Sequence, residues 1–363
     1  MKLKKISLAA LSLLFGLCWV APPSQAQDET PSTAKRSDFV SEASFVVGTF
    51  EPAKRDHSPA AIEAAARAFL DSLDAKLRKR AQSSLDTQVR REWTNLPARP
   101  NADGVRMGEL DSQQVNLACA LMASLFSEQG YNKMRDIMLA DDQLLRNGRP
   151  RPGFGTENFS VVIFGEPSAT QPWAFQIDGH HVGVNIAVEG EAMTMSPSFI
   201  GTQPQAFSIA GKKYRPFKYE TDLAHELVLS FSDDQIKQAV LGPQRARILT
   251  GPGNDNFVPK PQGVPCSTFD ASQKKTLLRL ISQWVGDLPP AQAQKRMQQI
   301  ESEIDQMKLS WNGGREPKSD MSYTIQSPSL IIEYACQDLG GDPLDHLHSV
   351  YRNPTNEYGK QLN

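Results

Sequence analysis

Four histidines stand close together in two stretches of the chain. His346 and His348 lie near the C-terminus, and His180 and His181 lie within the stretch Trp173–Asn185. Imidazole binds zinc, copper or iron, and alternate side chains of an extended backbone point to the same side. His346 and His348 can therefore address one ion, and we expect the four imidazoles to meet as a metal site.

The His180-His181 pair allows more than one geometry, because neighbouring residues of a regular strand face opposite sides. On a regular strand, His181 shares a side with Asn185. A bulge at Gly179 would instead bring His180 to the site. The alternative is a histidine that is hydrogen-bonded in a turn, with its neighbour half exposed. Without a bulge, the site gains only one of the two imidazoles.

Glu333 is a carboxylate inside the otherwise apolar run Leu330–Tyr334. A buried carboxylate is costly without a partner, so it must meet solvent, an arginine or a cation. We expect Glu333 to act as a metal ligand or a base, with a salt bridge to Arg352 as the alternative. Arg352, Asn185 and Gln176 are expected to orient an anionic or carbonyl-bearing substrate.

These residue types predict a metal-dependent enzyme that acts on a small molecule. Hydrolysis through metal-bound water is chemically simplest, and oxidation on copper or iron uses the same kinds of ligand. One alternative is a non-catalytic periplasmic protein that binds a small molecule or a metal. Another is a metal-free enzyme in which a histidine–glutamate pair transfers protons.

Other motifs add no further chemistry. His225-Glu226 does not begin an HExxH motif, because Leu229 stands where the second histidine would be. The sequence contains no GxSxG elbow, no P-loop and no complete GxGxxG. Gly153 and Gly155 are followed by Asn158, which is too little to indicate a nucleotide site.

The first 26 residues follow the pattern of a secretory signal peptide. Three lysines precede the apolar run Ile6–Ala21, and Ser24 and Ala26 are small residues of the kind that signal peptidase needs, so cleavage is expected after Ala26. The alternatives are an uncleaved anchor, for which the run is short, and a lipoprotein at Cys18, which lacks the small residue expected before it. We therefore expect a periplasmic or secreted protein in which residues 27–54 form a flexible leader.

Composition argues against other classes of protein. The 39 basic and 41 acidic residues are interspersed without a basic block, so nucleic acid is not an expected partner. No second segment is apolar enough to cross a bilayer, so no integral membrane segment is expected after signal cleavage. An oxidising compartment would permit one disulfide, for which Cys266–Cys336 is favoured because Cys119 lies among apolar residues.

The apolar periodicity predicts an α+β fold, with a mainly antiparallel sheet flanked by helices in a single large domain over residues 55–363. Helices are expected in the N-terminal part, with a stop at Gly130, and again over about 219–307. Short strands are expected over 159–207 and 308–334. We expect these two groups of strands to be near neighbours, which would bring the histidine stretches together.

Two blocks of residues carry a family resemblance. The first combines a Phe-Gly-x-Pro turn with a later Trp, Gln, Gly-His-His and Asn, at Phe164, Gly165, Pro167, Trp173, Gln176, Gly179, His180, His181 and Asn185. The second comprises Pro328, Glu333, His346, His348, Tyr351, Arg352 and Gly359. Together they resemble the domain of unknown function 3500 family of uncharacterised exported proteins, over roughly residues 61–359. The resemblance implies a domain extent and a set of site residues, and Asn353 departs from it where Asp is expected.

Overall fold

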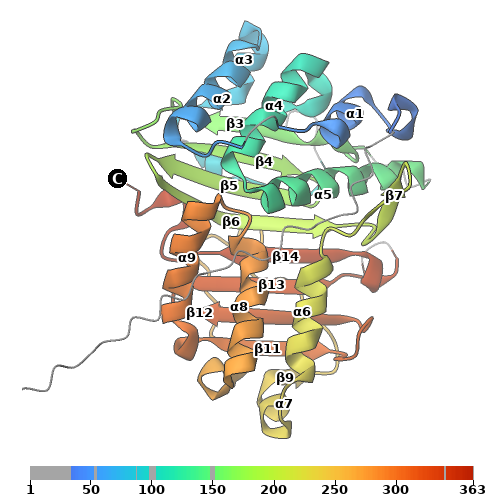
Figure 1. Ribbon diagram of the computed structural model, residues 1–363, viewed down its shortest axis with the longest axis vertical. Helices are drawn as coiled ribbons and strands as arrows, with labels where there is room; N and C mark the ends of the chain where they lie inside the picture. The colour runs from blue at the N-terminus through green and yellow to red at the C-terminus, as the bar shows by residue number, and fades with distance from the viewer. Residues whose placement is uncertain are drawn as a thin grey trace, which may run out of the picture.

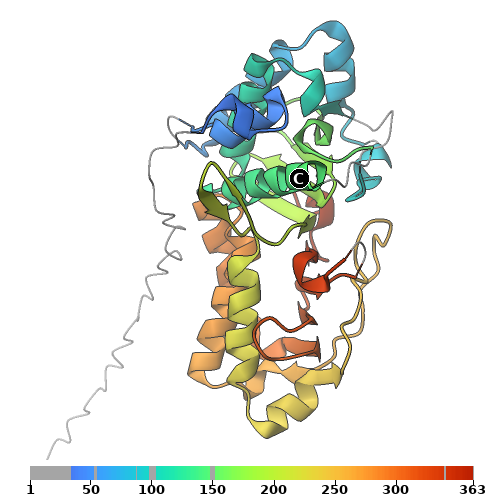
Figure 2. The ribbon, with the colours of Figure 1, turned by 90° about the vertical axis from the view of Figure 1, so that its right-hand side faces the viewer.

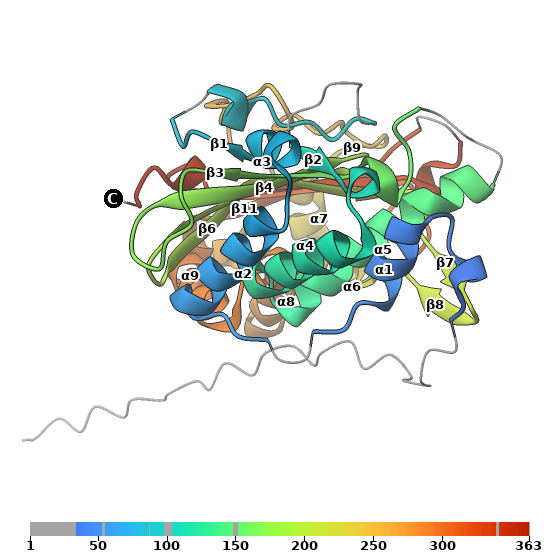
Figure 3. The same cartoon turned by 90° about the horizontal axis from the view of Figure 1, so that it is seen from above.

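The computed structural model describes residues 34–52, 55–86, 88–97, 104–147, 152–338 and 341–362. One large sheet runs through the molecule, with helices packed on one face and irregular segments on the other (Figures 1 and 3). This arrangement confirms the predicted single α+β domain. The expected signal peptide, residues 1–26, lies outside the described residues.

Most strands belong to this one sheet, in the order β1-β3-β4-β5-β6-β14-β13-β12-β11-β10. The first half contains β1 (Gln82–Ser83), β2 (Val105–Arg106), β3 (Ser160–Phe164), β4 (Trp173–Gly179), β5 (Val182–Glu189) and β6 (Ala192–Thr202). The second contains β9 (Val240–Gly242), β10 (Val264–Pro265), β11 (Lys308–Gly313), β12 (Met321–Ser327), β13 (Leu330–Cys336) and β14 (Leu347–Arg352). Among the described pairs, β1–β3 and β9–β11 are parallel and the others antiparallel. A separate hairpin pairs β7 (Phe207–Ile209) with β8 (Lys212–Tyr214).

The two groups of strands join where β6 pairs with β14. This pairing places His348 opposite Gly201, and β5 lies on the other side of β6. The turn that carries His180 and His181 therefore comes near the strand that carries His348. The expectation that the two groups are near neighbours is confirmed.

The helices form a layer on one face of the sheet (Figure 1). The helices that lie over the first half are α1 (Glu42–Thr49), α2 (Pro59–Asp71), α3 (Ala75–Ala81), α4 (Ser112–Leu125) and α5 (Glu128–Arg146). Those that follow, over the second half, are α6 (Lys218–Leu229), α7 (Asp233–Ala239), α8 (Ala271–Val285) and α9 (Pro290–Ser302). Among the described residues, no helix is both long and apolar enough to cross a membrane.

Strand alternation gives the two faces of the sheet different surroundings. On β14, the Ser349 hydroxyl accepts a hydrogen bond from Trp284 of α8, and the Tyr351 hydroxyl accepts one from Arg296 of α9. Ser349 and Tyr351 therefore face the helices. Val350 faces the other way and packs with Trp93 and Phe199. Figure 2 shows that face covered by irregular segments, which we call the loop face. His348 and Arg352 share the loop face with Val350, because side chains alternate along a strand.

Helix boundaries and the leader differ from the sequence expectation. Gly130 does not stop a helix but lies in the first turn of α5, which begins after the N-cap Ser127. A side chain at Gly130 would meet the backbone of Asp287, so close packing explains this glycine. Within the expected flexible leader, α1 is formed, and its Val46 and Val47 are buried.

The predicted Cys266–Cys336 disulfide is wrong, since both cysteines are free and buried. Cys266 follows β10 at the end of the sheet, whereas Cys336 ends β13, three strands away. Strands lie about 4.8 Å apart, and a disulfide needs Cα atoms within about 7 Å. Only the pairing of the strands, and not the cysteine spacing, determines this separation.

Candidate metal centre

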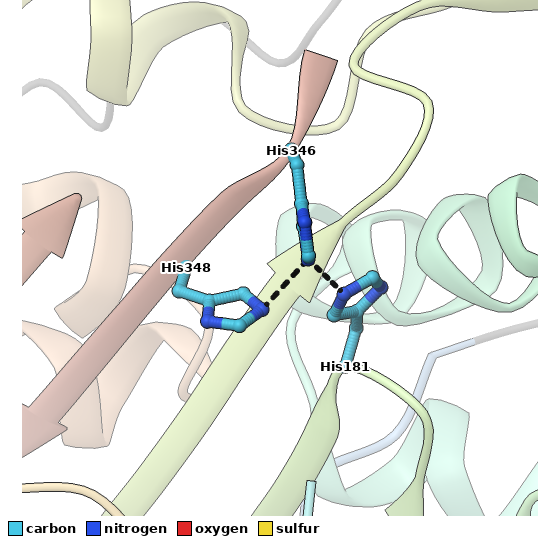
Figure 4. Close-up of side chains that lie close together, drawn as sticks. All are labelled: His181, His346 and His348. Carbon is cyan, nitrogen blue, oxygen red and sulfur yellow. Dashed lines mark hydrogen bonds between the residues drawn. The ribbon is translucent and has the colours of Figure 1, made fainter. Parts of the chain in front are cut away.

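Three imidazoles point their Nε2 atoms toward one another (Figure 4). The Nε2 atom of His346 lies 2.8 Å from that of His181 and 3.0 Å from that of His348. His181 and His346 are buried, and His348 is partly buried. We call these three residues the histidine triad. They form one of two groups of His and Asp side chains, among the described residues, that could hold a metal ion.

Strand geometry places two members of the triad. His346 and His348 stand two residues apart where β14 begins, so their rings leave the backbone on the same side. Their ring centroids are 4.7 Å apart and the ring planes are perpendicular. Both imidazoles therefore reach one point from the loop face.

The third member comes from a tight turn and not from a regular strand. Gly179 pairs with Val182, so His180 and His181 are the two residues of the β4–β5 hairpin turn. His181 has a left-handed backbone, with φ of 71°, and its N–H donates to the Asn95 carbonyl at 3.0 Å. The structure therefore has neither a regular strand nor a bulge at Gly179. It has the turn that was the alternative expectation, except that both histidines are buried.

Gly201 provides the space in which the rings meet. A Cβ atom at this position would lie 2.9 Å from Cδ2 of His348 and 3.0 Å from Cδ2 of His181. It would also lie 2.8 Å from the Leu347 carbonyl oxygen, which is backbone and cannot move aside cheaply. The triad therefore requires glycine on β6 opposite His348.

Burial favours the neutral form of two members of the triad, His181 and His348. Burial first, and then the neighbouring imidazoles, lower the pKa of His181 and of His348 well below the usual range. A neutral imidazole keeps the lone pair that a metal needs. These two rings can therefore bind an ion through whichever nitrogen carries no proton.

The spacing of the Nε2 atoms fits a small transition metal. Zinc–nitrogen bonds of 2.0–2.1 Å in a tetrahedron place ligand nitrogens about 3.3 Å apart. Two of the separations, 2.8 and 3.0 Å, need only a slight opening of the rings, and the ligand atoms of all three rings lie within 4.8 Å of one another. Three histidine ligands also leave a fourth position, as in catalytic zinc sites.

His180 lies beside the triad but is held by a different partner. Its Nδ1 atom lies 2.5 Å from Oδ1 of Asp141, which is buried in α5. The His180 ring stacks on His181 at 3.8 Å between centroids and on Phe154 at 4.3 Å. Asp141, His180 and His181 make up the second group of side chains that could hold an ion.

The second group fits a hydrogen-bonded pair better than an ion site. A metal lies in the plane of each imidazole that binds it, but the rings of His180 and His181 are stacked, at 28° to one another. A contact of 2.5 Å between nitrogen and oxygen is typical of a short, charge-assisted hydrogen bond. We therefore treat Asp141–His180 as a pair that supports the triad.

Glu333, which was expected to be a ligand or base, holds a loop in this structure. Its carboxylate accepts hydrogen bonds from the N–H groups of Leu249 and Thr250 and from the Thr250 hydroxyl. It belongs to neither group of candidate metal ligands. The alternative expectation, an ion pair between Glu333 and Arg352, is not found either. The Arg352 guanidinium instead donates to the Glu357 carboxylate and to the Phe257 carbonyl.

The residues expected to orient a substrate lie on the loop face but away from the triad. Arg352 stands four residues beyond His348, roughly 13 Å along β14 at 3.3 Å per residue. Gln176 donates to Oδ1 of Asn185 at 2.5 Å and to the Arg90 carbonyl, and Asn185 donates to the Pro197 carbonyl. These amides bond to the protein itself, and the structure does not bring them to the histidines.

Asp141 and Asp142 were not identified from the sequence as site residues. Both are about 1% exposed, and burial raises the pKa of each, that of Asp142 to about 6. The available signal was two adjacent aspartates inside the apolar helix sequence DIMLADDQLL. Phe154, which precedes β3, also contributes to the site by stacking on His180.

A model of the family described as "Protein of unknown function (DUF3500)" matches residues 55–360. The matched range contains the histidine triad, the Asp141–His180 pair and both blocks of the resemblance noted above. No curated protein and no solved structure matches the chain. Because the match covers most of the chain, this protein belongs to that family of unknown function.

Proposed function

We propose that the protein is a metal-dependent enzyme whose histidine triad binds a zinc, copper or iron ion, with hydrolysis as the favoured reaction. The observation that carries the proposal is the convergence of three Nε2 atoms from His181, His346 and His348. Nε2 of His346 contacts both of the other Nε2 atoms, and since a neutral imidazole nitrogen carries either one proton or one lone pair, it must share that proton or lone pair between two rings. A cation satisfies all three lone pairs at once.

The charges around the triad also favour a cation. Asp141 and Asp142 are buried side by side, and among the described residues no lysine or arginine forms an ion pair with either. Buried carboxylates without a positive partner are costly. A divalent ion at the triad would supply positive charge close to Asp141, through the His180 ring.

The residues of the site would have distinct roles. His181, His346 and His348 would hold the ion, and the Asp141–His180 pair would support His181 from one side. An ion with three protein ligands and an open position acidifies bound water or polarises a carbonyl. His348, which is partly exposed, lies on the side from which a small molecule would approach.

The alternative is a non-catalytic protein that binds a metal or a small molecule. It is supported by the engagement of Gln176, Asn185 and Arg352, whose polar groups bond to the protein itself. An enzyme would need other groups to orient its substrate. The two proposals share the metal centre and differ only in turnover.

Metal analysis of untagged, natively purified protein tests the shared part. We expect about one transition-metal ion per chain, and its loss in the double variant His346→Ala/His348→Ala with an unchanged circular dichroism spectrum. His57→Ala is the matched control, because His57 bonds the Ser124 carbonyl far from the triad in sequence. Unchanged metal content in the double variant would show that the ligands are wrong.

A chromogenic panel of carboxylic and phosphate esters then separates the enzyme from the binding protein. For the enzyme, we expect hydrolysis that a chelator abolishes, that added metal restores and that the double variant lacks. Stoichiometric metal binding without turnover on any ester would favour the non-catalytic alternative.

We also propose that the protein acts in the periplasm or outside the cell. The support is the N-terminal sequence, with a basic start, an apolar run and small residues before the expected cleavage point. N-terminal sequencing of protein from the periplasmic fraction should begin at Gln27. A chain that stays in the cytoplasm with its first residues intact would contradict this proposal.

A further inference from the structure

Asp141 is a buried carboxylate with a specific pair of partners. Its Oδ1 atom lies 2.5 Å from Nδ1 of His180, and its Oδ2 atom accepts the Gly155 N–H at 2.6 Å. An ionised carboxylate can only accept hydrogen bonds, so we assign the proton of this contact to Nδ1 of His180. A carboxylate suits this position because both of its oxygens are acceptors, whereas an amide has only one.

The bond to Asp141 decides which nitrogen of His180 carries the proton. With Nδ1–H donated to the carboxylate, Nε2 is the ring nitrogen that can carry a lone pair. The bond also holds the ring between Phe154 and His181, at centroid distances of 4.3 and 3.8 Å. One face of the His181 ring therefore packs on the His180 ring, and the bond to Asp141 of α5 holds the His180 ring in place.

Asp142 is a natural comparison, because it is equally buried and next in sequence. It accepts hydrogen bonds from the N–H and the hydroxyl of Thr156 and from the Ser44 hydroxyl of α1. None of these groups belongs to the triad or touches it in the described contacts. Asp142 therefore serves the packing of α1 and of the segment at 155–156.

We infer that Asp141 is a positioning residue of the metal centre, which acts through His180 to set the orientation of His181 and adds negative charge near the bound cation. This inference rests on the proposed metal site. A group that hydrogen-bonds a metal ligand directly typically changes metal affinity 10–100-fold when it is replaced. Asp141 acts through one further ring, so we expect an effect at the lower end of that range. Asp141 should therefore contribute to metal affinity, although it is not itself a ligand in this geometry.

The test compares Asp141→Asn with Asp142→Asn in the full-length protein. An amide at position 141 can serve only one of the two N–H groups, so either His180 or Gly155 loses its acceptor. We expect the zinc dissociation constant, measured by competition with a chelator, to rise at least tenfold in D141N and less than threefold in D142N. The absorption spectrum of the cobalt-substituted protein should change in D141N and match wild type in D142N.

A second measurement needs no metal. Nitrogen-15 spectra of the histidine rings in metal-free wild type should show His180 protonated at Nδ1, and Asp141→Ala should lose this signature. If position 141 does not tolerate substitution, Phe154→Leu removes the other support of the His180 ring and should weaken zinc binding about three- to tenfold.

The outcomes separate the two proposals. If wild type binds no metal, the proposed function fails, and the ring spectra alone decide whether Asp141 orients His180. Wild-type zinc affinity and cobalt spectrum in D141N would overturn the inference, as would ring spectra that Asp141→Ala leaves unchanged.

Discussion

Small residues that pack beside the histidine triad are as important to its geometry as the histidines themselves. Gly201 lies opposite His348 and leaves room for two imidazole rings. Ala335 flanks His348 on the other neighbouring strand. Burial then lowers the pKa of two of the rings, those of His181 and His348. The chemistry of the triad is therefore determined partly by residues that carry no reactive group.

Gly201→Ala should damage the centre without touching a ligand. The new methyl group would stand within 3.0 Å of both rings and 2.8 Å of a backbone carbonyl. We expect a loss of about 1–3 kcal/mol in the free energy of unfolding, the usual cost of overpacking, and at least tenfold weaker zinc binding. Gly242→Ala, whose Cβ would come no closer than 3.5 Å to any atom, is the control and should bind zinc as wild type does.

The pH dependence of stability should report the buried histidines. His181 and His348 have lowered pKa values in the fold, whereas histidines of the unfolded chain take up protons near pH 6.5. Below that pH the unfolded state of the metal-free protein binds more protons, so the free energy of unfolding falls.

The variant His348→Gln isolates this effect in chelator-treated protein. Its free energy of unfolding, from urea titrations between about pH 6.5 and 5, should fall less steeply than that of wild type. The difference in slope is at most about 1.4 kcal/mol per pH unit for one proton. The pKa of Asp142 is raised to about 6, so this residue increases the free energy of unfolding as pH falls. The same contribution is present in both proteins and cancels in their comparison. Parallel curves would mean that His348 is not a buried neutral base.

At the scale of elements, the start of β14 and the β4–β5 turn supply the triad, and a long loop covers the same face of the sheet. The loop joins β9 to β10 and packs Ile248 against Trp93, Phe199 and Val350. Glu333 and Arg352 hold its backbone from the sheet below. Polar residues within apolar strands thus attach the loop to the loop face.

Glu333→Gln should release this loop while leaving the fold intact. The amide can accept from Leu249 or Thr250 less well than a carboxylate, and hydrogen bonds to charged groups contribute about 1.5–3 kcal/mol. We expect faster limited proteolysis between residues 243 and 263, at unchanged metal affinity. Thr250→Val, which removes only the hydroxyl bond, should have a smaller effect on the same cleavage. Loss of metal with the loop still protected would return Glu333 to the list of ligands.

Across the whole molecule, a buried charge cluster joins the two halves of the helix layer. Lys133 of α5 lies 2.8 Å from Glu220 of α6 and 2.9 Å from Asp287, which follows α8. Burial, which by itself lowers the pKa of Lys133, is outweighed by these two carboxylates, so that pKa is raised. The lysine therefore stays charged and links helices from both halves of the sheet.

Lys133→Met should destabilise the whole domain. Removing one partner of a buried ion pair leaves uncompensated charge and typically costs about 3–5 kcal/mol. We expect that loss in chemical denaturation, and still a single transition, because one sheet spans both halves. Lys237→Met, at an exposed lysine on α7, should change stability by less than about 0.5 kcal/mol. A second transition in Lys133→Met would instead mean that the halves unfold separately.

Much of the fold follows from local sequence patterns. Short runs rich in apolar β-branched and aromatic residues predict β3, β4, β5 and β13 to within a few residues, because such side chains suit a strand that buries alternate or all positions. Capping residues such as Asp111 and Ser232 predict where α4 and α7 begin. The shared side of His346 and His348 follows from the same alternation.

The sequence by itself determined the α+β class, the family blocks and the two histidine stretches that contribute to the centre. Only the tertiary structure decided that His180 and His181 form a turn, that Asp141 supports them from a helix, and that Glu333 and Arg352 hold a loop. The physical reason is the range of the interactions. Alternation and capping act within a few residues, whereas the partner of a buried polar group depends on strand order and helix packing across the whole chain.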